Sequence, residues 1–387
     1  MNALRSSLSL LVCVIGLLAA TVPLAPPFPL RSQSSIEDSA TASDRAIAKA
    51  LTWLRLQQAD DGGWHSETYG SMRCGAGNTA LILDALSRLP ARHRGKCTDM
   101  ERGAVDFLLQ NLDASGCVRG TDGVVDFPAY ASALTLSALH RIDPEQHHEP
   151  IARMAGFLLK AQSLPSAEDE SILPGHGGWG PTSGVDPPEI AIARTNLSVT
   201  RHVLEALAES RKLTANAREA AIAYILRCRA GNAVSADVAG FCFSPHANDP
   251  LNKAGYFSPH DPRPYKPPTC DGIRALLACG VDLADAQIRE PAHWLESHQQ
   301  RASVLEPPDD AVDWEEALWF YHAATFSTVT GELHSPARRE RQRKSIDMLL
   351  TRQQSRGCWE NPDGRMREDD PLIATALALI TLSNAIE

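Results

Sequence analysis

The segment Lys49–Trp64 constrains the fold more than any other part of the chain, because it joins an amphipathic helix to a glycine turn that carries a tryptophan. Gly62 and the glycine after it can adopt positive φ and end the helix, so Trp64 needs a pocket in a neighbouring element. Gln58 can bond loose backbone groups at this turn. Apolar residues occupy the i, i+3, i+4 and i+7 positions of one helix face: Ile47, Ala50, Leu51 and Leu54.

This pattern returns along the chain at intervals of 50 to 70 residues. A glycine with a tryptophan two residues later closes the first, third and sixth copies, at Trp64, Trp179 and Trp359. Recurrence at such an interval predicts a repeat architecture. The positions equivalent to the glutamine, including two substituted ones, are Gln58, Leu112, Gln162, Arg229, Gln299 and Gln354.

A second kind of helix is predicted between the repeats. These runs are rich in Ala, Thr, Leu and Val and poor in charge, which suits burial on most faces. Each repeat is therefore a helix pair, amphipathic then buried, and six pairs predict an all-α fold with the buried helices inside. Periodicity favours a closed double ring over an open solenoid without proving closure. The buried runs are Asn78–Leu89, Tyr130–Ile142, Leu197–Leu207, Gly272–Cys279, Trp314–Thr328 and Pro371–Leu382.

Two long connections interrupt the pairs, Ser163–Glu189 and Ala230–Pro268. Loops of this length are usually functional lids or disordered insertions. The second loop contains several Phe and Tyr residues, so we expect an ordered loop packed over another part of the molecule.

The N-terminus resembles an export signal, with Arg5 before the apolar run Leu8–Leu24. We predict a signal peptide at 1–25, or alternatively an uncleaved membrane anchor, then a linker at 26–43 and one domain at 44–387. The mature protein would be periplasmic or extracellular. Eight cysteines follow Cys13 and permit disulfides, but spacing does not give their pairing. The net charge of −10 argues against nucleic-acid binding.

The unit from Lys49 to Trp64 resembles the QW repeat of squalene and oxidosqualene cyclases, which prenyltransferase β subunits share more loosely. Exported bacterial "prenyltransferase and squalene oxidase" repeat proteins are similar too, since Gly240–Pro245 matches their Gly-Phe-x-Phe-Ser-Pro loop. The resemblance implies an α/α toroid, with about six inner and six outer helices around an apolar cavity that holds an isoprenoid.

The cyclase reaction is not expected from this sequence. Squalene–hopene-type cyclases protonate an alkene with an Asp-x-Asp-Asp cluster, which the chain lacks. The nearest string is Glu368-Asp369-Asp370 before Pro371. We interpret these acidic residues as the favourable N-terminus of a helix, with proline in its first turn.

Resemblance to prenyltransferases implies a zinc site formed by Asp, Cys and His. Asp271 and His322 match two of the ligands, whereas Ile273 stands where the thiolate belongs. No cofactor is therefore expected, with zinc as the alternative. If the protein is an enzyme, the candidate catalytic residues at the cavity mouth are Asp271, His322, Asp313 and Tyr321.

Three functions follow from the sequence as hypotheses. The favoured one is an exported toroid that binds an isoprenoid or another apolar lipid in its central cavity. The alternatives are a divergent prenyltransferase or terpenoid-modifying enzyme, and a non-catalytic scaffold whose ring is filled by its own side chains.

Overall fold

The structure is a computed structural model, and it describes residues 33–120, 126–166, 171–230, 239–258, 260–298, 314–333 and 336–384. The chain forms two units, Met1–Ser39 and Ala40–Glu387. Helix α1 (Gln33–Gln57) begins inside the segment that was predicted as a linker. The predicted signal peptide lies outside the described residues. None of the helices in the described ranges is long and apolar enough to cross a membrane.

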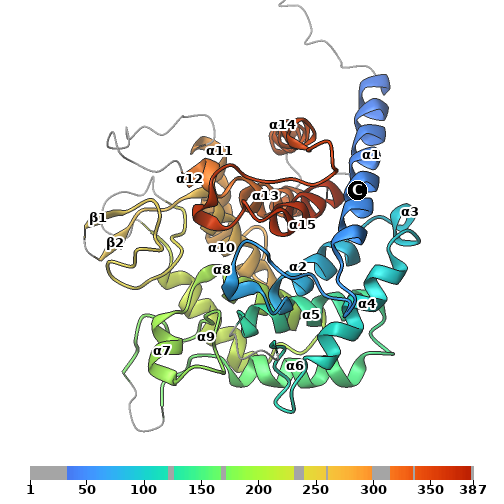
Figure 1. Cartoon of the computed structure of the whole chain (residues 1–387). Helices are drawn as coiled ribbons and strands as arrows, with labels where there is room; N and C mark the ends of the chain where they lie inside the picture. Colours follow the sequence, from blue (N-terminus) through green and yellow to red (C-terminus); the bar gives the residue numbers. More distant parts are fainter. Residues whose placement is uncertain are drawn as a thin grey trace, which may run out of the picture. The chain divides into compact units, whose positions relative to one another are not determined.

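Within the described part of the second unit, six helices form an inner ring in which each packs against the next. The last of them, α15, packs back against the first, α2, so the ring is closed (Figure 1). The sequence favoured closure without proving it, and the packing of α15 on α2 confirms it. The inner helices are α2 (Ala76–Ser87), α5 (Pro128–Ile142), α8 (Leu197–Glu209), α10 (Lys266–Ala278), α13 (Trp319–Leu333) and α15 (Pro371–Ser383).

Outer helices alternate with the inner ones along the described chain, and most pack on an inner neighbour in sequence. Every residue of α2 is buried, whereas outer helices such as α6 bury one face and expose the other, because their apolar residues follow the helical period. The fold is therefore an α/α toroid, as predicted. The outer helices are α1, α4 (Thr98–Gln110), α6 (His148–Lys160), α9 (Ala215–Arg227), α11 (Ala286–His298) and α14 (Pro336–Arg352).

The connections carry the short elements. The strands β1 and β2 pair as an antiparallel hairpin within the second long loop. All eight cysteines after Cys13 are buried, and no two of them form a disulfide with each other. The short elements are α3 (Ala91–Arg94), α7 (Pro188–Ala193), α12 (Trp314–Ala317), η1 (Gly70–Met72), η2 (Gly364–Met366), β1 (Tyr256–Ser258) and β2 (Asp261–Pro262).

A glutamine side chain ties neighbouring outer helices together at three places. Gln58 donates from Nε2 to a carbonyl oxygen of its own turn at 2.8 Å and to one in α4 at 3.0 Å. Gln162 makes the same two bonds, reaching α9. In the sixth copy of the repeat, Gln353 makes these two bonds in place of the predicted Gln354, and it reaches α1. This last bond links the end of the chain to its first described helix.

The tryptophans tie each outer helix to an inner one. Trp64, Trp179 and Trp359 are fully buried, and each indole Nε1 donates to a carbonyl oxygen of the preceding outer helix at 2.7 to 2.9 Å. Their backbone N–H groups donate to a threonine hydroxyl of the following inner helix. Val118 and Phe241 hold the same place in two copies without tryptophan, donating to Ser132 and Thr269. These residues hold neighbouring elements of the toroid together.

Candidate functional site

A cavity opens inside the ring near the N-terminal ends of the inner helices. All six inner helices contribute to its lining, and it encloses about 720 Å³ of empty space, counting its open mouth. Most of the lining is apolar or aromatic. The lining residues are Leu81, Tyr130, Ser198, Phe243, Leu251, Lys253, Tyr265, Pro267, Pro268, Asp271, Leu318, Tyr321, Met366, Glu368, Ile373 and Leu377.

The second long loop covers part of this cavity and is ordered by one asparagine. The Asn252 side-chain oxygen accepts from the backbone N–H groups of Phe243 and Ser244 at 2.9 and 3.1 Å. Its amide nitrogen donates to the Tyr256 hydroxyl at 2.9 Å. Phe243 lines the cavity, and so does Leu251, which is 45% exposed and marks the mouth. The expectation of an ordered loop packed over another part of the molecule is therefore confirmed for the described part of this loop, residues 239–258 and 260–268.

The polar wall of the cavity is formed by Tyr130, Ser198, Asp271 and Tyr321. The Tyr321 hydroxyl donates to Asp271 Oδ2 at 2.8 Å. A phenol has one hydrogen, so the 2.6 Å contact between Ser198 Oγ and Tyr321 Oη requires Ser198 to be the donor. Behind this wall, Arg201 donates to Asp271 Oδ1 at 3.1 Å and to the Tyr321 hydroxyl at 3.1 Å.

Tyr130 differs from the rest of the polar wall. It is the third residue of α5, and its ring stands edge-to-face with that of His202, with centroids 4.8 Å apart. Its hydroxyl makes no hydrogen bond with any described residue. Burial raises the pKa of Tyr130; the charge of Arg201 opposes this rise, and the charges of Asp84 and Asp271 add to it. Tyr130 therefore brings an unused donor and acceptor to the cavity.

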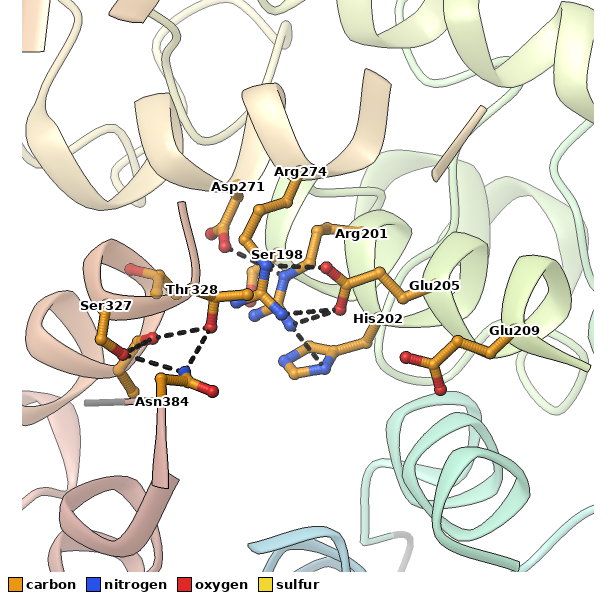
Figure 2. A network of polar contacts seen from close by, with 12 residues as sticks. Ser198, Arg201, His202, Glu205, Glu209, Asp271, Arg274, Ser327, Thr328 and Asn384 are labelled. Carbon is orange, nitrogen blue, oxygen red and sulfur yellow. Dashed lines mark hydrogen bonds and ion pairs between the residues drawn. The ribbon is translucent and has the colours of Figure 1, made fainter. Parts of the chain in front are cut away.

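Charged side chains fill the ring behind the polar wall, and we call them the inner ion network. Figure 2 shows Arg201 and Glu205 of α8 pointing toward α10, where Arg274 donates to Glu205 at 2.7 and 2.9 Å. Burial alone would raise the pKa of Glu205, but the charges of Arg274 and Arg201 outweigh it and lower this pKa. Four arginines and four carboxylates balance one another: Asp84, Arg88, Arg141, Arg201, Glu205, Glu209, Asp271 and Arg274.

The predicted catalytic residues are only partly brought together. Asp271 and Tyr321 meet at the polar wall. His322 does not line the cavity, and its buried Nδ1 has no hydrogen-bond partner among the described residues. Burial lowers the pKa of His322 to about 3, helped by the charge of Lys266. Asp313 lies outside the described residues, so its catalytic role stays a prediction, as do those of the other three.

The residues around Asp271 do not fit a zinc ion. Both carboxylate oxygens already accept hydrogen bonds, and one of the donors is the guanidinium of Arg201, a cation where a second cation would have to bind. Ile273, at the position of the missing thiolate, is fully buried among apolar groups. No group of three or more metal-ligating side chains occurs in the described part of the chain.

Glu368 belongs to the cavity, although the sequence suggested only a helix N-terminus for its segment. Asp370 does cap α15, accepting from the backbone N–H of Leu372 at 2.9 Å. Glu368 instead lines the cavity, is 1% exposed, and accepts from the backbone N–H groups of Phe320 and Tyr321 at 2.9 and 2.8 Å. It therefore caps the first turn of α13 and holds Tyr321 at the polar wall.

The arginine side of the site was not predicted from the sequence. Arg201, Glu205 and Glu209 are spaced four residues apart, which places them on one face of α8. Charges at that spacing in a helix predicted to be buried were the available signal. Their partner Arg274 lies on α10 one helical turn after Asp271, so it faces the same side.

No protein-family model and no curated protein matches the sequence. Solved structures do resemble the fold. The type II terpene cyclase MstE from Scytonema aligns with a TM-score of 0.56 at 14% identity, covering 90% of this chain and 98% of that one. A variant with merosterolic acid A bound as product gives 0.59 at 13%, covering 91% and 99%. An alpha-1,6-mannanase from Salegentibacter gives 0.57 at 11%, covering 90% and 100%.

These similarities define the class of fold, a terpene-cyclase-like α/α toroid. The same toroid carries a mannanase, so the fold alone does not choose between chemistries. The function must therefore be argued from the cavity of this chain.

Proposed function

We propose that the protein binds an isoprenoid or a comparably apolar lipid in its central cavity. The observation that carries the proposal is the lining, to which every inner helix contributes and in which apolar and aromatic side chains predominate. Transfer of an apolar chain from water into such a lining is favourable by about 0.8 kcal/mol for each buried methylene group. The related fold of MstE supports the proposal, since its solved complexes hold geranylgeranyl dihydroxybenzoate as substrate and merosterolic acid A as product.

The scaffold alternative requires a ring filled by its own side chains. The inner ion network occupies the part of the ring behind the polar wall. The open cavity on the other side of that wall supports ligand binding over a purely structural ring.

Catalysis is a second candidate, and Glu368 is the observation that bears on it. Burial raises the pKa of Glu368 to about 7, although three hydrogen-bond donors lower it. Protonation of an alkene needs an acid stronger than an ordinary carboxylic acid, whereas Glu368 is weaker. This favours binding, or a terpenoid modification that uses Asp271 and Tyr321, over cyclisation. Zinc analysis of the purified protein, combined with His322→Ala, tests the prenyltransferase form of this alternative.

The binding proposal is tested by mass spectrometry of lipids that co-purify with the protein. Ile373→Trp, on the cavity side of α15, is expected to fill the cavity and reduce lipid recovery at least tenfold. Met348→Trp, 46% exposed on outer helix α14, is the matched control and should retain the lipid. An absence of bound lipid in the wild type, or equal recovery from both variants, would contradict the proposal.

We also propose that the protein is exported. The N-terminal segment that suggests export lies outside the described residues, so the structure does not test it. Cell fractionation with N-terminal sequencing tests it: a mature protein that begins near residue 26 in the periplasm or medium is expected. Recovery of the full-length chain in the cytoplasm would contradict export and leave the binding proposal untouched.

A further inference from the structure

We propose that the ligand of the central cavity is an isoprenoid alcohol, an apolar chain with one neutral hydroxyl group that lies against the polar wall. This inference rests on the proposed function and adds the chemical class of the ligand. It is carried by the hydrogen-bond arrangement of Tyr130 and Ser198, which lie on neighbouring inner helices and both line the cavity.

The hydrogens of this wall can be assigned one by one. Tyr321 gives its only hydrogen to Asp271, so Ser198 must give its own to Tyr321. Ser198 Oγ is then left with a free lone pair and no free hydrogen. Tyr130 has no partner among the described residues and keeps its hydrogen available. The wall therefore offers the ligand one donor, from Tyr130, and one acceptor, from Ser198.

An alcohol matches both groups, because its oxygen accepts from Tyr130 while its hydrogen is donated to Ser198. A ketone can only accept and would use Tyr130 alone. A hydrocarbon in the same place would separate the Tyr130 hydroxyl from water and leave it without a partner, which is the costly case for a buried polar group.

The charges behind the wall favour a neutral oxygen function. The inner ion network contains as many arginines as carboxylates, so the network itself presents no net charge to the ligand. Lys253 also lines the cavity, but its ammonium group is already engaged, since it lies 4.5 Å from the centre of the Trp314 ring and donates to the Pro250 carbonyl oxygen at 3.3 Å. Asp271 is the charged member nearest the cavity, and a ligand carboxylate or phosphate would meet its negative charge. Its oxygens already accept from Arg201 and Tyr321, so it offers a ligand ammonium group little either.

The test compares farnesol with farnesane, its saturated hydrocarbon analogue, by displacement of the apolar fluorophore N-phenyl-1-naphthylamine from the purified protein. Wild-type protein is expected to bind farnesol at least tenfold more tightly than farnesane. Tyr130→Phe keeps the ring against His202 and removes only the hydroxyl, so the preference should fall to near one. Ser198→Ala should reduce it as well, and it serves as the independent variant if Tyr130→Phe does not fold.

Tyr224→Phe is the matched control, since it removes a buried hydroxyl of outer helix α9 that does not line the cavity. It should keep the preference for farnesol. Equal binding of farnesol and farnesane by the wild type would overturn this inference and leave lipid binding intact. A preference that survives both Tyr130→Phe and Ser198→Ala would overturn it too. Failure of both ligands to displace the fluorophore would instead count against the proposed function.

Discussion

The pH dependence of stability should reveal the buried carboxyl of Glu368, and the perturbation is Glu368→Gln. Burial raises the pKa of Glu368 from 4.5 to about 7, the charge of Glu316 adds to this, and donors from Tyr321, Phe320 and Asn361 oppose it. Between these two values the folded protein holds a proton that the unfolded chain has released. The free energy of unfolding therefore falls as pH rises from about 4.5 to about 7.

The size of this effect follows from the same two values. A rise in pKa from 4.5 to about 7 corresponds to about 3 kcal/mol of stability, present below pH 4.5 and lost above about pH 7. Glutamine does not titrate, so Glu368→Gln should lack this part of the profile. The wild type should lose about 3 kcal/mol relative to the variant between pH 4.5 and pH 8.

Urea unfolding at several pH values measures the difference, with tryptophan fluorescence as the probe because Trp64, Trp179 and Trp359 are fully buried. Other titrating groups are common to both proteins and cancel in the comparison. Glu360→Gln removes an exposed carboxylate from the same segment, and its profile should run parallel to that of the wild type. A difference between wild type and Glu368→Gln that is flat, or that grows in the wild type's favour with pH, would refute the reasoning.

Two further predictions concern the ties between outer helices. Gly357 has φ of 102°, and a Cβ there would lie 2.6 Å from the carbonyl oxygen of Lys49, so Gly357→Ala should cost about 2 kcal/mol or more in thermal unfolding. Gly255→Ala, at φ of 71° with nothing within 4 Å, should cost about 1 kcal/mol, and equal losses would contradict the close approach. Gln353→Ala should cost about 1 to 3 kcal/mol, because it removes the hydrogen bonds that Gln353 Nε2 donates to carbonyl oxygens in α1 and in its own turn. Gln354→Ala should change stability by less than 1 kcal/mol, and the reverse order would restore the assignment made from sequence.

The ring could be predicted from the sequence because its signal is local and repeated. Apolar periodicity identified the helix pairs, and five of the six inner runs correspond to single helices. The fourth began too late in the prediction, since α10 starts at Lys266 and carries two prolines in its first turn, where they are tolerated. The fifth run is divided at Leu318 into α12 and α13, and no breaker residue marks that division.

The site was harder to predict because its members come from helices far apart in the chain. Asp271 and Tyr321 were found through their resemblance to a known pattern, which also drew attention to His322. The partner that decides the chemistry of Asp271 is Arg201, from a helix about seventy residues earlier. Periodicity reports which face of a helix is buried, but it does not report which buried charges meet. The same limit hid Glu368, whose raised pKa depends on contacts with α13.

The division of the ring into a charged part and an open part explains how a cavity can persist inside it. Closely packed interiors normally leave few voids, so an open centre deprives the inner helices of contacts there. The inner ion network joins α2, α5, α8 and α10 through shared arginines; Arg141, for example, bonds both Asp84 and Glu209. Such buried pairs add little net stability, but breaking one leaves an uncompensated charge, so they penalise any shift of one helix against the next. With the helices fixed in this way and tied from outside by Gln353 and its equivalents, the cavity end can stay open for a ligand.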